Sequence, residues 1–150
     1  MRDLASKLAH VVVIAPATYA ADTTPAAIDL QGYDSAAIAL AIGVGGITFD
    51  GTNKIEFVLT HADDDGTGNP GAFANVAAAD INGAGAPAVV TNGIVKSLVA
   101  AHAAADVTEI GYIGGKRYVK LLADFSGTHG TGTPISAIMA KGHPRNAPAA

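Results

Sequence analysis

Apolar and polar positions alternate with period two through the middle of the chain. In residues 36–42, Ile or Leu occupies every second position from Ile38, with Ala between them. In residues 55–61, Ile, Phe and Leu alternate with Glu, Val and Thr. Alternation of this kind predicts half-buried β-strands, and both runs are too short and too rich in β-branched residues to favour a helix.

Shorter runs with strand character surround these two. We expect strands at residues 27–30, 94–99, 109–113, 117–123 and 135–140, and a short strand or irregular crossing at residues 73–81. Residues 100–105 favour a helix by propensity, although a strand at residues 94–99 suits the context better. Seven or eight short strands separated by turn signals predict an all-β fold, an antiparallel sandwich or jelly roll.

Three loops are expected to connect neighbouring strands as hairpins. The polar loop at residues 61–71 is rich in Asp, Gly and Asn, which are the usual turn residues. Gly114–Gly115 lies between two apolar runs, a pattern typical of a hairpin turn. Residues 127–134 are Gly- and Thr-rich and lie between two expected strands, which predicts a flexible hairpin loop.

The two ends of the chain differ from this middle. We expect residues 1–25 to form an extended N-terminal arm, residues 26–141 the β-sandwich domain, and residues 142–150 an extended C-terminal arm or tail. No apolar run approaches the roughly 20 residues that a membrane-spanning helix needs. The N-terminal segment has faint features of a signal peptide, but Asp3, His10 and Pro16 interrupt them, so we expect synthesis in the cytoplasm without export.

Charge is scarce along the chain. Charged residues make up 15% of the 150 positions, against roughly 25% in an average soluble domain. A low charge content suits a surface partly covered by protein neighbours, because interface cores are depleted in charge. The net charge is −4, and the nine Lys and Arg residues are dispersed, which disfavours nucleic acid as a main partner. The absence of Cys excludes disulfides, thiolate nucleophiles and Cys-ligated metals.

Asp63, Asp64 and Asp65 are the weak candidates for a metal site. Three adjacent carboxylates could gather a hard cation such as calcium, which takes six to eight oxygen ligands. An EF-hand loop would also need an oxygen ligand where His61 stands and a Glu where Ala72 stands. That motif is therefore excluded, and a solvated turn is the favoured interpretation, with no metal or cofactor expected.

No pattern in the sequence predicts an enzyme. The chain has no Gly-x-Ser-x-Gly elbow, no phosphate-binding loop and no closely spaced pair of zinc-ligating histidines. The five histidines are far apart: His10, His61, His102, His129 and His143. We therefore expect no catalytic residues.

Lys116, Arg117 and Tyr118 follow the Gly114–Gly115 turn and place two cations beside an aromatic ring. Such a group could contact an acidic partner surface or a glycan. The alternative, which we favour, is that Tyr118 or Val119 packs inward while the two cations stay solvated.

Six short segments, taken in order, resemble a family of viral proteins. They are residues 1–4, 27–36, 61–66, 76–81, 111–119 and 142–144. In this series the chain resembles small virion proteins encoded close to the major capsid gene in tailed bacteriophages and related prophages. The resemblance spans nearly the whole chain, and its motifs are short and structural.

The resemblance implies a structural virion protein, namely a head decoration or cement protein on the capsid surface. It implies a homo-oligomer, with a trimer favoured, that binds between subunits of the major capsid protein. Residues 1–20 and 142–150 would then lie along neighbouring subunits as arms. Two alternatives remain open at this point: a head–tail connector or tail component, and a carbohydrate-binding jelly-roll module. The second alternative needs exposed aromatic side chains, and the chain has only four Tyr and four Phe.

Overall fold

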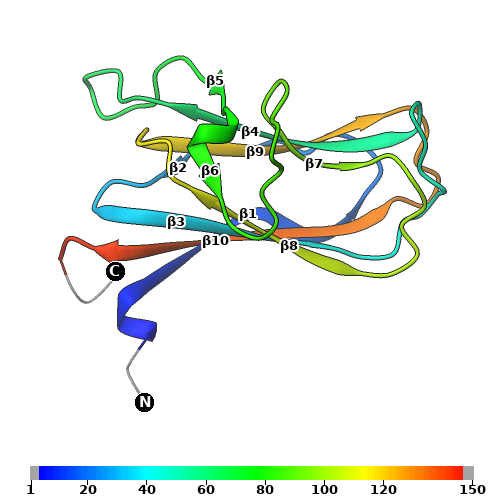
Figure 1. Cartoon of the computed structure of the whole chain (residues 1–150), viewed down its shortest axis with the longest axis horizontal. Helices are drawn as coiled ribbons and strands as arrows, with labels where there is room; N and C mark the ends of the chain where they lie inside the picture. The colour runs from blue at the N-terminus through cyan, green and yellow to red at the C-terminus, as the bar shows by residue number, and fades with distance from the viewer. Residues whose placement is uncertain (1–3, 147–150) are drawn as a thin grey trace.

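Two antiparallel β-sheets pack face to face in the computed structural model, which describes residues 4–146 (Figure 1). Sheet A has the strand order β1-β10-β3-β8-β6, and sheet B has the order β2-β9-β4-β5, with β7 also paired to β4. The strands are β1 (Leu8–Tyr19), β2 (Ile28–Asp29), β3 (Tyr33–Ile42), β4 (Lys54–Ala62), β5 (Ala74–Asn75), β6 (Ile81–Asn82), β7 (Ile94–Leu98), β8 (Asp106–Tyr112), β9 (Tyr118–Ser126) and β10 (Thr133–Pro144). Two short 3-10 turns complete the elements, η1 (Ala5–Lys7) and η2 (Ala78–Asp80).

Eight strands form four pairs that are nested from the outside of the chain inward. β1 pairs with β10, β2 with β9, β3 with β8 and β4 with β7, each antiparallel. One long antiparallel ribbon rolled into two sheets produces this order, which is the winding of a jelly roll. The all-β sandwich expected from the alternating sequence is confirmed.

Most connections pass from one sheet to the other. Residues 113–117 lead from β8 in sheet A to β9 in sheet B, and residues 127–132 lead from β9 back to β10 in sheet A. The hairpins predicted at Gly114–Gly115 and at residues 127–134 are therefore wrong, because the strands that each loop joins do not pair with one another. The loop at residues 63–73 does join neighbours, since Thr60 pairs with Asn75 and β4 with β5.

The alternating positions form the core between the sheets. Ile38, Leu40 and Ile42 on β3 are 0–1% exposed, and so are the inward residues of β4. The inward residues of β4 are Ile55, Phe57 and Leu59. Burying one face of each strand against the opposite sheet is the usual reason for a period-two pattern. The strand predictions for residues 36–42 and 55–61 are confirmed.

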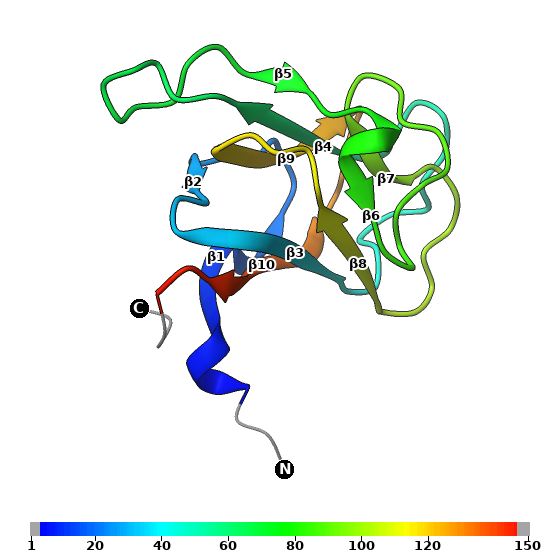
Figure 2. The ribbon, with the colours of Figure 1, turned by 60° about the vertical axis from the view of Figure 1, so that its left-hand side comes forward.

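The N-terminal segment differs from the arm predicted for residues 1–25. From Leu8 to Tyr19 it is β1, an edge strand that pairs with β10 along its length and buries Ile14 in the core. Two register shifts, on either side of Ile14, interrupt its alternation. Figure 2 shows that only the stretch around η1 stands away from the sandwich. Residues 1–3 lie outside the described part of the chain.

The C-terminal segment also belongs partly to the sandwich. β10 continues through Gly142 to Pro144, and the backbone N–H of Arg145 donates to the carbonyl of Gly32 at 2.9 Å. Residues 147–150 of the predicted tail lie outside the described residues. The strand at residues 94–99 is confirmed as β7, whereas residues 100–105 form a loop. Between residues 4 and 146, no helix has the length and apolar character needed to cross a membrane.

Candidate functional site

Two segments that the sequence offered separately meet at one end of the sandwich. Residues 63–71, here called the anchored loop, project beyond the end of β4 (Figure 2). The connection that carries Lys116 and Arg117 lies beside this loop. Lys116 Nζ binds the carboxylate of Asp63, and Arg117 Nη1 binds the carboxylate of Asp64. The two cations therefore hold the base of the loop.

The anchored loop is also ordered from within. Asp64 Oδ1 accepts the backbone N–H groups of Gly66 at 2.6 Å and Gly68 at 3.1 Å. Asp65 Oδ1 accepts the Thr67 backbone N–H at 2.8 Å and the Thr67 hydroxyl at 2.7 Å. The hydrogen bonds to Asp65 lower the pKa of its carboxyl, and the bond from the Thr67 hydroxyl has the largest effect. Asp side chains that accept turn N–H groups fix the backbone of a loop, so this one has a preset shape.

Arg117 is the hub of the site. Its guanidinium donates to both oxygens of Asp29, from Nε at 3.0 Å and from Nη2 at 2.8 Å, and to Gln31 Oε1 at 2.6 Å. This two-pronged contact matches the fork geometry of a guanidinium and a carboxylate. The hydrogen bond from Arg117 lowers the pKa of Asp29, and the Asp29 side chain raises the pKa of Arg117. Together these bonds join β2, β9 and the anchored loop.

Tyr118 supports the loop from below. Its side chain is 4% exposed, and its hydroxyl donates to the Gly68 carbonyl at 2.5 Å. The prediction that Tyr118 or Val119 packs inward is confirmed for Val119, which lies in the core, whereas Tyr118 is buried beneath the anchored loop. The accompanying prediction that Lys116 and Arg117 stay solvated is incomplete, because both bind carboxylates of this same chain. The carboxylates that these cations meet belong to this same chain: Asp63 and Asp64 in the loop, and Asp29 on β2.

The three aspartates offered as weak metal ligands do not converge. Asp63 binds Lys116, Asp64 binds Arg117, and Asp65 binds the turn at Thr67. Across residues 4–146, no three His, Asp or Glu side chains are grouped so that they could hold an ion. Each of the three carboxylates is bound within the chain, and together these contacts fix the shape of the loop.

A buried polar pair beneath the loop was not foreseen from the sequence. His61 on β4 is 8% exposed and Tyr112 on β8 is 5% exposed, and the His61 Nδ1 atom lies 3.0 Å from the Tyr112 hydroxyl. The hydroxyl also accepts the backbone N–H of Lys116 at 3.0 Å, so its proton is available to His61. Burial raises the pKa of Tyr112. This pair links the two sheets directly to the segment that anchors the loop.

We predict that Tyr112→Phe lowers the free energy of unfolding by about 1–3 kcal/mol, because it leaves His61 Nδ1 and the Lys116 N–H without a partner. Urea denaturation monitored by circular dichroism measures the change. Tyr19→Phe is the matched control, since it removes a 2.9 Å hydrogen bond to the Ala15 carbonyl at an exposed position. The prediction is contradicted if the two substitutions have equal effects.

The lowered pKa of Asp29 makes the contact between Arg117 and Asp29 sensitive to acid. A carboxyl whose pKa is lower in the folded chain contributes stability above its ordinary value near 3.8 and loses it as pH falls through the folded value. The effect is modest and salt-dependent, since the Asp29 side chain is 42% exposed. We therefore expect Asp29→Asn to reduce the fall in melting temperature between about pH 6 and about pH 3. Thermal melts followed by circular dichroism at the two pH values measure the fall, and an equal fall in wild type and variant would contradict the prediction.

One Ser–His pair is brought together across 108 positions of sequence. Ser35 Oγ lies 2.8 Å from His143 Nδ1 at the surface, where β3 begins and β10 ends. A working nucleophile also needs a group that orients the histidine and donors for an oxyanion. Asp34, the nearest carboxylate in sequence, binds Arg145 instead. Besides His61, the buried histidine among the described residues is His129. Its Nε2 atom donates to the Ser126 carbonyl, and its ring packs against aromatic rings.

None of the protein families, curated proteins or solved structures compared with this chain matches it.

Proposed function

We propose that the protein is a capsid decoration protein, a homo-oligomeric structural component that binds between major capsid subunits on the surface of a phage head. The observation that carries the proposal is the anchored loop, a projecting element with a preset shape whose basic and acidic groups are paired within the chain. The ordered series of short segments that resembles virion proteins encoded near the major capsid gene supports the same assignment.

A preset loop is suited to binding another protein surface. Residues 65–70 at its tip are exposed, while Asp64, Arg117 and Tyr118 hold its base. A loop that is ordered before binding loses little conformational entropy on contact, so more of the interaction energy is retained as affinity. The ion pairs at its base also spare the partner surface from supplying counter-charges.

Binding of this kind would stabilise a shell by mass action. A rigid body that binds two neighbouring subunits only when they are assembled favours the assembled state over the separated one. The jelly roll supplies the rigid body, because both of its sheets contribute to one continuous core. No chemical step is required, and the protein would act through its contacts alone.

The carbohydrate-binding alternative depends on exposed aromatic rings. All four Tyr and four Phe lie within the described residues, and each is buried or half-buried. Tyr118, the ring that the sequence offered for stacking on a sugar, lies beneath the anchored loop at 4% exposure. The observations therefore favour a protein partner over a glycan.

Binding to purified capsid shells tests the proposal. Shells assembled without this chain are mixed with the wild-type protein, with Arg117→Gln and with Lys54→Gln, and are then sedimented. Lys54 pairs with Glu56 on the outer face of sheet B, so Lys54→Gln removes one positive charge far from the loop. Wild type and Lys54→Gln should sediment with the shells, and Arg117→Gln should bind about tenfold more weakly or worse. Failure of the wild-type protein to bind shells would overturn the proposal.

A further inference from the structure

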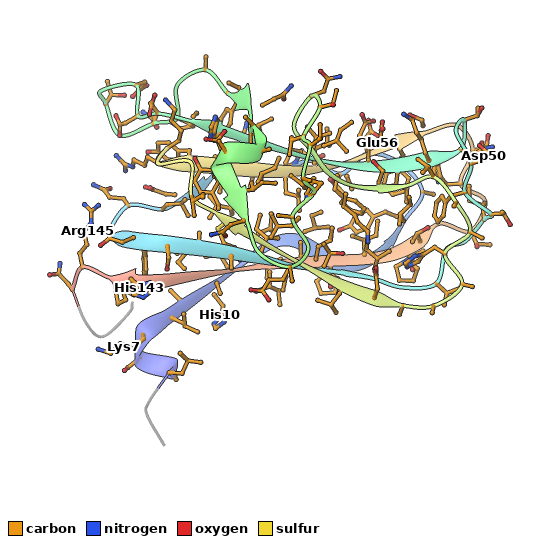
Figure 3. All side chains as sticks on the ribbon, viewed as in Figure 1. Lys7, His10, Asp50, Glu56, His143 and Arg145 are labelled. Carbon is orange, nitrogen blue, oxygen red and sulfur yellow. The ribbon has the colours of Figure 1, made fainter. Side chains whose placement is uncertain are left out.

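The outer faces of the two sheets differ in charge. On sheet B the outward residues include four ionised side chains: Lys54, Glu56, Lys120 and Asp124. On sheet A, the outward positions in three adjacent rows of β1, β10, β3 and β8 form a surface here called the alanine face, in which Glu109 is the one carboxylate and no Lys or Arg occurs. These positions are His10, Val12, Ala37, Ala39, Ala41, Val107, Glu109, Gly111, Ser136, Ile138 and Ala140. Figure 3 shows Glu56 and His10 on opposite sides of the sandwich.

The register of sheet A arranges the alanine face in rows across β1, β10, β3 and β8. The central row is Val12, Ile138, Ala39 and Glu109. The row on one side is His10, Ala140, Ala37 and Gly111. The row on the other side is Ser136, Ala41 and Val107, flanked on β1 by the exposed bulge residues Ala15 and Pro16. The register therefore fixes which strand presents each large and each small side chain in a row.

Large aliphatic side chains on this face are open to water. Val107 is 69% exposed, Val12 is 57% exposed and Ile138 is 43% exposed. Between them the Ala positions form a low floor that another sheet could approach closely, whereas the side chain of Asn82 covers Gly111. An apolar patch that spans several strands with few charges is typical of a protein-binding surface.

We propose that the alanine face is a self-association surface that binds the alanine face of a second copy. The two-fold axis lies in the plane of contact, parallel to β10 and β3 and midway between them. This rotation places β10 opposite β3 of the second copy and β1 opposite its β8. Each residue then faces a residue of the same row. Ile138 then meets Ala39 of the second copy, His10 meets the Asn82 side chain that covers Gly111, and Val107 meets the Ala15–Pro16 bulge. The largest aliphatic side chain of the central row therefore meets a small one, and the polar His10 meets a polar amide, so these contacts are complementary.

Charge supports the same orientation. Val12 meets the stem of Glu109 from the second copy, which leaves that carboxylate one row away from His10. An imidazole N–H can donate to a carboxylate, and the contact strengthens when the ring is protonated. The two-fold axis forms this contact twice. A rotation that brought Glu109 against Glu109 would instead oppose like charges.

The size of the face predicts a weak pair. Four strands spaced about 4.8 Å apart and three rows spaced about 6.7 Å apart cover about 400 Å² on each copy. Stable interfaces bury about 800 Å² on each partner, so this contact should be reversible and concentration-dependent. A face that binds itself yields a dimer, and a trimer would need a different contact. The inference rests on the proposed function in one respect: it names the surface through which copies of the proposed homo-oligomeric decoration protein associate.

Sedimentation velocity over a wide concentration range tests the pairing without any viral particle. We expect wild type to shift from monomer to dimer as concentration rises. Ala39→Lys, at the centre of the face, should weaken the dimer about tenfold or more. Ala39 is exposed, so the substitution should leave the fold intact, which a thermal melt checks. Thr60→Lys adds the same charge on the outer face of sheet B and should dimerise like wild type.

A charge exchange tests the orientation. His10→Glu and Glu109→Lys should each weaken the dimer, and the double variant should recover much of the loss, because Glu and Lys again face each other. A wild-type protein that stays monomeric, an Ala39→Lys variant that dimerises normally, or a double variant no better than the singles would each overturn the inference. Shell binding is measured separately, so a failed dimer leaves the decoration proposal standing.

Discussion

Replacing Phe57 by Ala should lower the free energy of unfolding by about 3–5 kcal/mol, which is a large part of the total stability of a small domain. Phe57 is 0% exposed and lies in β4, between β9 and β7 in sheet B. Its ring lies in the core that joins sheet B to sheet A. Truncation removes the buried apolar area and leaves a cavity that rigid neighbouring strands cannot fill. Urea denaturation followed by far-ultraviolet circular dichroism measures the loss.

Val58→Ala is the matched control for this prediction. Val58 is the next residue of β4 and lies on the outer face of sheet B, where it is half-buried. Its truncation should cost less than about 1 kcal/mol. Equal costs for the two substitutions would mean that β4 does not present Phe57 to the core, which would contradict the sandwich.

Gly46→Ala should be the second most damaging substitution, with an expected loss of about 2 kcal/mol or more. A Cβ at Gly46 would lie 1.9 Å from the carbonyl oxygen of Gly132 and 2.7 Å from its carbonyl carbon. These are backbone atoms, so no rotation of a side chain relieves the overlap. The loop after β3 would have to move away from the loop before β10. A fall in melting temperature of several degrees is the expected readout.

Gly51→Ala is the control for the glycine substitution. A Cβ there meets nothing within 4 Å, and the backbone is not in the left-handed region. The variant should match wild type or gain up to about 1 kcal/mol, because Ala restricts the unfolded chain. If Gly46→Ala were as stable as Gly51→Ala, the close approach of the two loops would be contradicted.

The sequence predicted the layers of the fold better than the path between them. Period-two alternation in residues 36–42 and 55–61 predicted strands whose inward residues are now buried. The predicted hairpins at Gly114–Gly115 and at residues 127–134 failed because a turn signal marks where a strand ends and carries no information about which sheet receives the next strand. In a jelly roll that choice is set by pairing with distant strands, such as β8 with β3.

The N-terminal strand was missed for a local reason. β1 contains two register shifts, near Val12–Ile14 and Ile14–Ala17, and Pro16 interrupts it further. Each shift moves the following side chains to the other face, so the alternation that reveals β3 and β4 is lost. A proline is tolerated there because β1 is an edge strand and one side of its backbone needs no partner.

The candidate site could be only half predicted. Asp63–Asp65 and Lys116–Tyr118 were both singled out from their residue types, but Lys116 and Asp63 are 53 positions apart. Spacing within the sequence cannot show that the two segments meet when the sheet pairing that brings them together is unknown. The buried His61–Tyr112 pair had no local signal, because an isolated His or Tyr in a strand is common in protein cores.

The copy number and position of the chain in an intact particle test the central claim most directly. Quantitative gel densitometry of purified virions, with the major capsid protein as internal standard, gives the count, and electron microscopy of the same particles gives the position. A decoration protein should be present on the order of hundreds of copies, at repeated positions over the capsid surface. Its complete absence from virions, or about six or twelve copies in a ring at one vertex, would contradict the account.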